Sequence, residues 1–249
     1  MSREWFEPYN PTSPFASLYE EEFKLPLERT LEEVASIEKI IQSMDNKPRV
    51  LDLAGGFGRI GSLLVQGGLV GSLIDLDLNR RLLKVAQKSG INNAIEGDMR
   101  YLGFTADTFD LVLLMFTSFG YFVTPEDDLK VLQEAKRVLH LGGTLLLDLP
   151  NYDRILQNFS PERDLLLLDN SKIVYRKELV GDLLIETRTR IFSDMNQAQM
   201  PPIRLRIYNQ KSAGDACLRA GFSAVHAFDQ NLQTYEPTSS NRLWLVCTV

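Results

Sequence analysis

The segment with the most distinctive chemistry lies at residues 50–59, where an apolar stretch leads directly into three closely spaced glycines. Gly55, Gly56 and Gly58 have no Cβ atom, so the chain there can adopt left-handed conformations and a ligand can approach the backbone closely. The residues that follow predict a helix, whose first N–H groups are free to donate to a carboxylate or another acceptor. The segment therefore predicts a ligand-binding loop between a strand and a helix.

Residues 56–61 also fit the pattern GxGxxG, and Asp77 follows at about the spacing of an acid that binds a ribose diol. A carboxylate suits a vicinal diol because its two oxygens accept two O–H donors at once. An NAD site is one interpretation, and a tight turn without a ligand is another. Asp75 lies on the same strand face as Asp77, so the ribose-binding acid could be two residues earlier, but the apolar spacing of the following helix favours Asp77.

The elements around these residues alternate between apolar strands and amphipathic helices, the pattern of βαβ units. A helix over residues 27–44 comes first and ends before Pro48. The segments predicted next are a strand at 49–54, a helix from about 58, a strand at 70–76, a helix from about 79, strands at 93–96 and 109–115, a helix at 125–139, a turn at Gly142-Gly143 and a strand at 144–149. Continuous apolar strands of this kind are typical of a parallel sheet covered on both faces.

After residue 151 the alternation stops, and strands are predicted at 165–168, 173–175, 183–192 and 203–207 without intervening helices. This pattern indicates an antiparallel β insert. A helix at 212–220 and strands at 223–228 and 242–248 then complete the core.

Three features together resemble class I S-adenosylmethionine-dependent methyltransferases. Asp52 lies in the first strand two residues before the loop, Asp98 follows the third strand, and the last two strands form a closing hairpin. The resemblance covers nearly the whole chain and is closest to bacterial small-molecule methyltransferases of the methyltransferase-25 and methyltransferase-11 type. The segments that carry it are Glu4-Trp5-Phe6, Glu28-Arg29-Thr30, residues 50–59, Asp77-Leu78-Asn79, Gly97-Asp98-Met99-Arg100, residues 116–122, Leu141-Gly142-Gly143 and Ala220-Gly221-Phe222.

The resemblance implies an α/β fold, with a Rossmann-like seven-stranded methyltransferase sheet and the antiparallel β insert after its fifth strand. The expected parts are an N-terminal helical cap at 1–48, a cofactor-binding core at 49–151, an insert on the substrate side at 152–210, and a completion of the core at 211–249.

The resemblance also implies S-adenosyl-L-methionine as the cofactor. Asp77 would take both ribose hydroxyls, Asp98 would accept from the adenine amino group, and Met99 would donate its backbone N–H to the ring. The full set of implied contacts is Asp52, Ala54, Gly55, Gly56, Gly58, Asp77, Leu78, Asp98, Met99 and Met115. Ala54 departs from the family pattern, which has glycine there, but adds only one methyl group.

No catalytic residue and no metal are predicted. Positioning an acceptor in line with a sulfonium methyl group needs no metal and often no strong base. His140 and His226 have no acidic neighbour in the sequence, so we interpret both as structural or solvated. The acidic run Glu126-Asp127-Asp128 follows Pro125 and is typical of a helix N-terminus rather than a metal site.

Tyr19, Tyr121 and Tyr152 are the candidates for contact with a small-molecule methyl acceptor, although each could serve packing alone. The insert alternates apolar and charged residues, which suits either a wall of the acceptor pocket or the interface of a homodimer.

The composition and charge of the chain limit the classes of partner that we expect. The formal net charge is -6 and no basic stripe is present, so no nucleic-acid partner is expected. Cys217 and Cys247 form no CxxC pair and are interpreted as buried thiols. No signal peptide or membrane span is predicted, so the expected compartment is the cytoplasm.

The sequence therefore predicts an S-adenosylmethionine-dependent methyltransferase that modifies an O or N atom of a small molecule. A catalytically silent S-adenosylmethionine-binding protein is the alternative, and an NAD-linked oxidoreductase is a weaker one.

Overall fold

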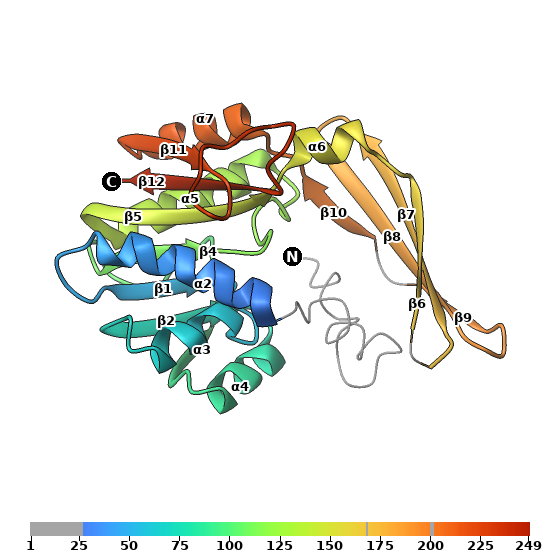
Figure 1. Ribbon diagram of the computed structural model, residues 1–249, viewed down its shortest axis with the longest axis horizontal. Coiled ribbons are helices and arrows are strands. Elements are labelled where there is room, and N and C mark those ends of the chain that lie inside the picture. The colour runs from blue at the N-terminus through green and yellow to red at the C-terminus, as the bar shows by residue number, and fades with distance from the viewer. Residues whose placement is uncertain (1–26, 168, 200–201) are drawn as a thin grey trace. The chain divides into compact units, whose positions relative to one another are not determined.

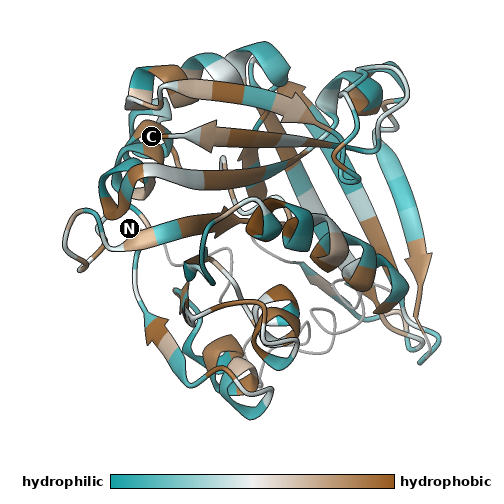
Figure 2. Ribbon diagram, turned by 60° about the vertical axis from the view of Figure 1, so that its left-hand side comes forward, coloured by the Kyte–Doolittle hydropathy of each residue, from teal (hydrophilic) through white to brown (hydrophobic). Residues whose placement is uncertain are grey.

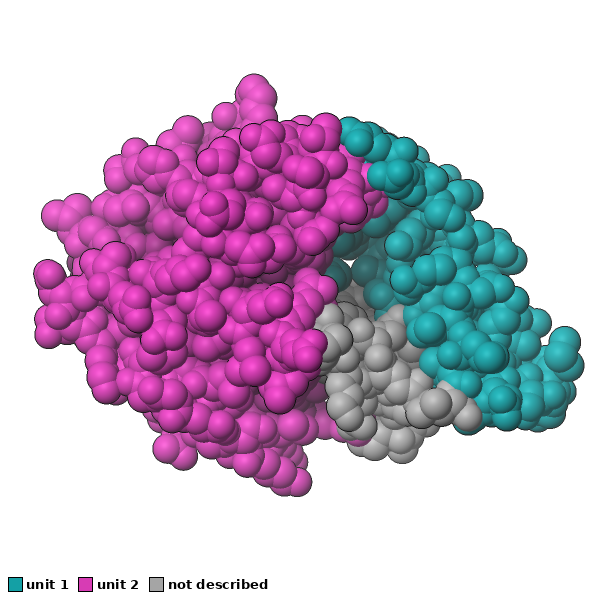
Figure 3. Space-filling view, in the orientation of Figure 1, with its two compact units in different colours: residues 1–25, 121–123, 156–207 teal, residues 26–120, 124–155, 208–249 magenta. Residues whose placement is uncertain are grey.

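The computed structural model describes residues 27–167, 169–199 and 202–249. The chain divides into two compact units, coloured separately in Figure 3. The larger contains residues 27–120, 124–155 and 208–249, and the smaller contains residues 121–123 and 156–207 of the described part. Most of the predicted N-terminal cap, including Tyr19, lies outside the described residues.

The larger unit is built on a seven-stranded sheet with the order β11-β12-β5-β4-β1-β2-β3 (Figure 1). Its strands are β1 (Arg49–Leu53), β2 (Ser72–Asp77), β3 (Asn93–Glu96), β4 (Phe109–Leu114), β5 (Leu139–Pro150), β11 (Ala224–Phe228) and β12 (Arg242–Thr248). The first five are parallel, and β12 pairs antiparallel with both β5 and β11. The predicted fold class, including the closing hairpin, is confirmed.

Helices cover this sheet because each carries an apolar stripe. They are α2 (Leu27–Gln42), α3 (Arg59–Gln66), α4 (Arg80–Lys88), α5 (Pro125–Val138) and α7 (Gln210–Ala220). Residues of α2, α3 and α4 share one apolar cluster with Val50 of β1 and with Leu111 and Leu113 of β4, and strands of the sheet carry brown segments in Figure 2. Cys217 of α7 and Cys247 of β12 are buried free thiols, as predicted.

The predicted turn at Gly142-Gly143 is wrong, because both glycines lie inside β5. Phe109 pairs with Leu139, whereas Leu111 pairs with Thr144, so the extra residues of β5 form a bulge. Gly142 takes the left-handed conformation that the bulge requires, with a φ of 83°. His140, which precedes these glycines, is also a residue of β5.

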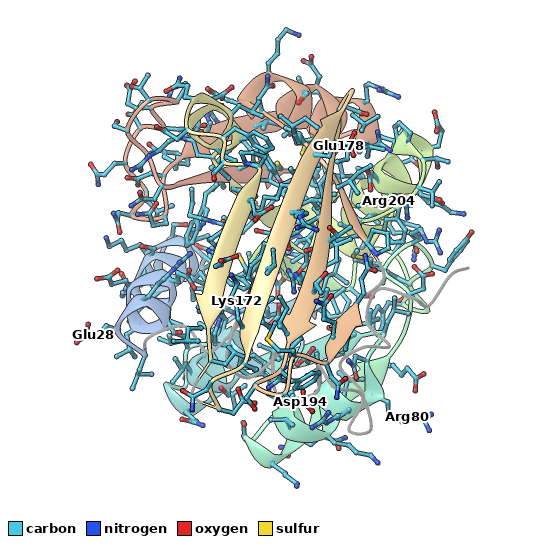
Figure 4. All side chains as sticks on the ribbon, turned by 90° about the vertical axis from the view of Figure 1, so that its right-hand side faces the viewer. Glu28, Arg80, Lys172, Glu178, Asp194 and Arg204 are labelled. Atoms are coloured by element: carbon cyan, nitrogen blue, oxygen red, sulfur yellow. The ribbon has the colours of Figure 1, made fainter. Side chains whose placement is uncertain are left out.

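The insert forms a second, antiparallel sheet of order β10-β8-β7-β6, with β9 paired to β8. Its strands are β6 (Glu162–Leu166), β7 (Lys172–Val180), β8 (Leu183–Ile191), β9 (Gln197–Gln199) and β10 (Ile203–Arg206). Figure 4 shows its charged side chains, among them Lys172, Glu178 and Arg204. The antiparallel insert is confirmed, but it is preceded by a short helix, α6 (Tyr152–Gln157), that strand periodicity did not predict.

No helix in the described ranges combines the length and apolar character that a membrane span needs.

Candidate functional site

The glycine loop follows β1 and opens α3, as predicted. Ala54, Gly56 and Gly58 all have left-handed backbones, with φ of 55°, 66° and 75°. Gly58 is the N-cap of α3, and among the described residues no side chain caps that helix terminus. Its first N–H groups therefore stay available for a ligand. Ala54 adopts the glycine-like conformation although it carries a Cβ atom, which costs about 1 kcal/mol.

Asp77 connects the glycine loop to the start of α4. Its Oδ2 accepts from the Gly56 N–H at 3.0 Å, and its Oδ1 accepts from the Asn79 N–H at 2.7 Å. Burial raises the pKa of Asp77 to about 6, against the lowering effect of the N–H groups of Asn79, Gly56 and Leu78. Each oxygen keeps a second acceptor site, so the carboxylate can still bind two hydroxyl groups.

Asp52 and Asp75 lie deeper in the sheet. They pair directly across β1 and β2 and are 2% and 0% exposed. A Cβ atom at Gly55 would lie 2.6 Å from Asp75 Oδ1 and 2.9 Å from Asp52 Oδ2, so only glycine fits above these two carboxyls. Asp77, at the end of β2, is half-buried, whereas Asp75 is enclosed. This difference favours Asp77 over Asp75 as the acid that a ligand can reach.

Asp98 follows β3 in an arrangement that the sequence did not indicate. Arg100 donates to both of its oxygens and also pairs with Asp127 Oδ1 at 3.0 Å. Burial alone would raise the pKa of Asp98, but the hydrogen bonds and charge of Arg100 outweigh it, so the pKa is lowered. Met99, between these residues, is buried. The acidic run at 126–128 forms the first turn of α5, as predicted.

The turn after β4 is held by a buried ion pair that sequence reasoning missed. Phe116 and Thr117 follow the buried Met115, and both have left-handed backbones, with φ of 55° and 63°. Asp148 of β5 accepts from the Phe116 N–H at 2.8 Å and from Arg242 Nε at 2.8 Å. Arg242 of β12 also donates to Thr117 Oγ1 at 3.0 Å. These partners are about 30 to 125 residues apart in the chain, so no local pattern could reveal them.

A second missed group joins α2 to the glycine loop. Arg59, the first residue of α3, donates through Nη1 to Thr30 Oγ1 at 2.9 Å and to Glu33 Oε2 at 2.5 Å. Arg29 donates to Glu33 through Nε. The guanidinium carbons of Arg29 and Arg59 lie 5.9 and 5.2 Å from the centre of the Phe116 ring. The motif Glu28-Arg29-Thr30 marked this segment in the sequence, but its periodicity indicated only a helix face.

The residues present fit the functional groups of S-adenosylmethionine. Asp77 has acceptor sites for a diol, and the backbone of the glycine loop is unobstructed by side chains at Gly55, Gly56 and Gly58. Within the described part of the chain, Arg59 uses only Nη1 in hydrogen bonds and Arg29 uses only Nε. Their other N–H groups can bind a carboxylate such as that of the methionine portion.

The three acceptor-site candidates are not brought together within one unit. Tyr19 lies outside the described residues, and Tyr121 is half-buried in the smaller unit. Tyr152 is 2% exposed at the start of α6 in the larger unit. Their role in acceptor binding stays a prediction. His140 lies against Asp110, with its Nε2 at 2.7 Å from Oδ1, in agreement with a structural role.

Comparison with known families places most of these residues in one matched region. Residues 51–147 match the family described as "Methyltransferase domain". The protein named "Putative methyltransferase YqeM" of Bacillus subtilis (strain 168) is 30% identical over 121 residues, which cover 47% of this chain and 48% of YqeM. The chain thus spans about half the length of this curated relative.

Solved structures share the fold over a wider range. An S-adenosylmethionine-dependent methyltransferase from Clostridium acetobutylicum ATCC 824 has a TM-score of 0.75 at 16% identity, with 94% of this chain and 97% of that chain covered. CalS10 from Micromonospora echinaspora, an amino pentose methyltransferase solved with bound S-adenosylmethionine, has a TM-score of 0.68 at 17% identity, with 93% and 97% covered.

The matched region begins inside β1 and ends inside β5, so it contains the glycine loop, Asp52, Asp77 and Asp98. The match to a methyltransferase domain favours a methyltransferase over the NAD-linked interpretation of the GxGxxG pattern. Residues 51–147 are thus similar to methyltransferase domains, and the chain shares its fold with solved S-adenosylmethionine-dependent methyltransferases.

Proposed function

We propose that this chain transfers the methyl group of S-adenosylmethionine to an oxygen or nitrogen atom of a small molecule. The observation that carries the proposal is the bridge made by Asp77 between the glycine loop and the start of α4. That bridge leaves two acceptor sites beside a backbone that a ligand can approach. CalS10 acts on an amino pentose, so amino sugars belong in any panel of acceptors tested with this chain.

The bound cofactor supplies an electrophilic methyl group on a sulfonium ion. The residues of this chain bind and orient it: Asp77 accepts from the ribose diol, and Arg29 and Arg59 hold the methionine carboxylate. Asp98, Met99 and Met115 complete the proposed contacts, with Met115 beside the methionine portion. The acceptor atom would have to lie in line with this methyl group, and the proton that it loses would pass to water. Positioning accounts for most of the acceleration.

We also propose that the insert selects the acceptor. It follows β5, whose carboxyl end lies at the sheet edge where α/β proteins bind ligands, and the glycine loop and its acids all precede it. Substitutions in the segment from about Tyr152 to Tyr208 are then expected to change turnover or acceptor preference, with cofactor affinity nearly unchanged. Loss of cofactor affinity in a folded insert variant would contradict this assignment.

Titration calorimetry with S-adenosylmethionine, S-adenosylhomocysteine and NAD tests the cofactor site. Both sulfur compounds should bind and NAD should not. Asp77→Ala should weaken S-adenosylhomocysteine binding by about 1–3 kcal/mol, the scale for losing hydrogen bonds to a charged group. Lys88→Ala, at the far end of α4, is the matched control and should bind normally. Binding of NAD in place of both sulfur compounds would overturn the proposal, and turnover of an acceptor panel separates an enzyme from a silent binding protein.

A further inference from the structure

Two acidic side chains meet beneath the glycine loop. Asp52 and Asp75 are partners in the parallel register of β1 and β2, so their side chains lie on the same face of the sheet. Asp75 Oδ1 and Asp52 Oδ2 both lie within 3 Å of the point that a Cβ atom of Gly55 would occupy. The two carboxyl groups therefore converge directly under the loop that binds the cofactor.

In the part of the chain that the structure describes, no hydrogen-bond donor stabilises a negative charge on Asp75. Its side chain is 0% exposed, and neither carboxylate oxygen accepts a hydrogen bond from any residue in the described ranges. The charged groups that influence it are Asp52 and Asp77, which are both acidic. Arg59 is the cation of this cluster, and it acts on Asp52. Two buried carboxylates in this arrangement cannot both be ionised at low cost.

We propose that Asp75 keeps a proton on its carboxyl group and donates it in a hydrogen bond to Asp52. Asp75 is then a positioning residue: as a neutral acid it fixes the Asp52 carboxylate under Gly55 and lets the glycine loop keep its conformation. The inference rests on the cofactor site proposed above.

The electrostatics agree with the placement of the proton. Burial, together with the charges of Asp52 and Asp77, raises the pKa of Asp75 to about 9. Burial raises the pKa of Asp52 to about 7, where Arg59 opposes the shift and Asp77 adds to it. Arg59 lowers the pKa of Asp52 and does not act on Asp75, so the surroundings of the pair favour the proton on Asp75.

The pair Asp75→Asn and Asp75→Ala tests this role. Asparagine keeps an N–H donor of similar size that cannot ionise, whereas alanine removes the donor. At pH 7, S-adenosylhomocysteine should bind Asp75→Asn within about threefold of the unmodified protein and Asp75→Ala more than about tenfold more weakly, the scale of a lost hydrogen bond to a charged group. Equal weakening in both variants would overturn the proposal, since a donor would then be irrelevant.

Thermal unfolding of the protein without ligand, followed from pH 5 to pH 10, is the second measurement. A carboxyl whose folded pKa is raised contributes stability at low pH that is lost as the pH rises through the folded value. The melting temperature of the unmodified protein should therefore fall toward pH 9 more steeply than that of Asp75→Asn. Parallel profiles would mean that Asp75 is not protonated. If neither the unmodified protein nor any variant binds S-adenosylhomocysteine but the melting profiles differ, the proposed cofactor site is wrong and the proposed protonation of Asp75 is retained.

Discussion

Asp148→Ala should destabilise the protein far more than the loss of an ordinary ion pair. Asp148 is 1% exposed, and its two oxygens accept separately from Arg242 Nε and the Phe116 N–H, each at 2.8 Å. Removal leaves the Arg242 guanidinium, whose side chain is 12% exposed, without its carboxylate. Breaking one partner of a buried pair costs about 3–5 kcal/mol. At about 2–4 °C per kcal/mol for a chain of this size, the melting temperature should fall by about 10 °C.

The assay is urea and thermal unfolding of each variant, compared with a matched control on the surface. Arg176 and Glu162 form an ion pair at 3.0 Å with side chains 67% and 56% exposed, so Arg176→Ala should cost less than about 1 kcal/mol. If Asp148→Ala costs no more than this control, the turn after β4 does not depend on the buried pair and the reasoning is refuted.

A substitution at Thr117 separates the effect of backbone strain on the free energy of unfolding from the effect of the buried ion pair. Thr117 has a φ of 63°, a conformation in which a β-branched residue is strained by about 1–2 kcal/mol. Glycine adopts it without strain, but Thr117→Gly also removes the Oγ1 that accepts from Arg242. In the Asp148→Ala background the relief of strain and the lost hydrogen bond, each about 1 kcal/mol, should therefore nearly cancel. A loss of about 1 kcal/mol in the double variant would show that the turn relaxes to another conformation once Asp148 is removed.

Two further predictions concern helix ends. Gly58→Ala should destabilise the protein by about 3 kcal/mol, because a φ of +75° disfavours a Cβ atom and that atom would overlap Ile91 Cδ1. The control Gly103→Ala has open space around it and should change the free energy of unfolding by less than about 0.5 kcal/mol. Urea unfolding measures both variants. Asn209→Ala should destabilise the protein by about 1 kcal/mol, because Asn209 caps α7 through a reciprocal pair of hydrogen bonds with Ser212. Thermal unfolding compares this variant with Gln210→Ala at the exposed neighbouring position, and equal melting temperatures would contradict the prediction.

The sequence predicted the features that depend on local pattern. Apolar runs and helical periodicity are set by neighbouring residues, so the alternation of strands and helices and the antiparallel insert followed directly from them. The glycine loop and Asp77 were also identified, because Gly56 and Gly58 mark left-handed positions and Asp77 ends a strand. Ala54 took the same conformation without glycine, which no propensity indicates.

The pattern of neighbouring residues gave a wrong prediction where strand pairing determines the local structure. Gly142 and Gly143 were interpreted as a turn, but the register between β4 and β5 makes them part of a bulged strand. A bulge is a property of two strands, so the residues of one strand cannot distinguish it from a turn. The short helix α6 was missed because six residues are too few for periodicity to be recognised.

Only the tertiary structure could assign partners to the buried charges. Asp148 and Arg242 lie 94 residues apart, and Glu33 and Arg59 lie 26 residues apart. Asp52 and Asp75 become neighbours only through the register of β1 and β2. A buried charge is stable only with a partner or a proton, and which of these it has depends on what the fold places within a few ångströms. The sequence by itself therefore determined the fold class and the position of the glycine loop, while long-range packing decided the electrostatics of the proposed site.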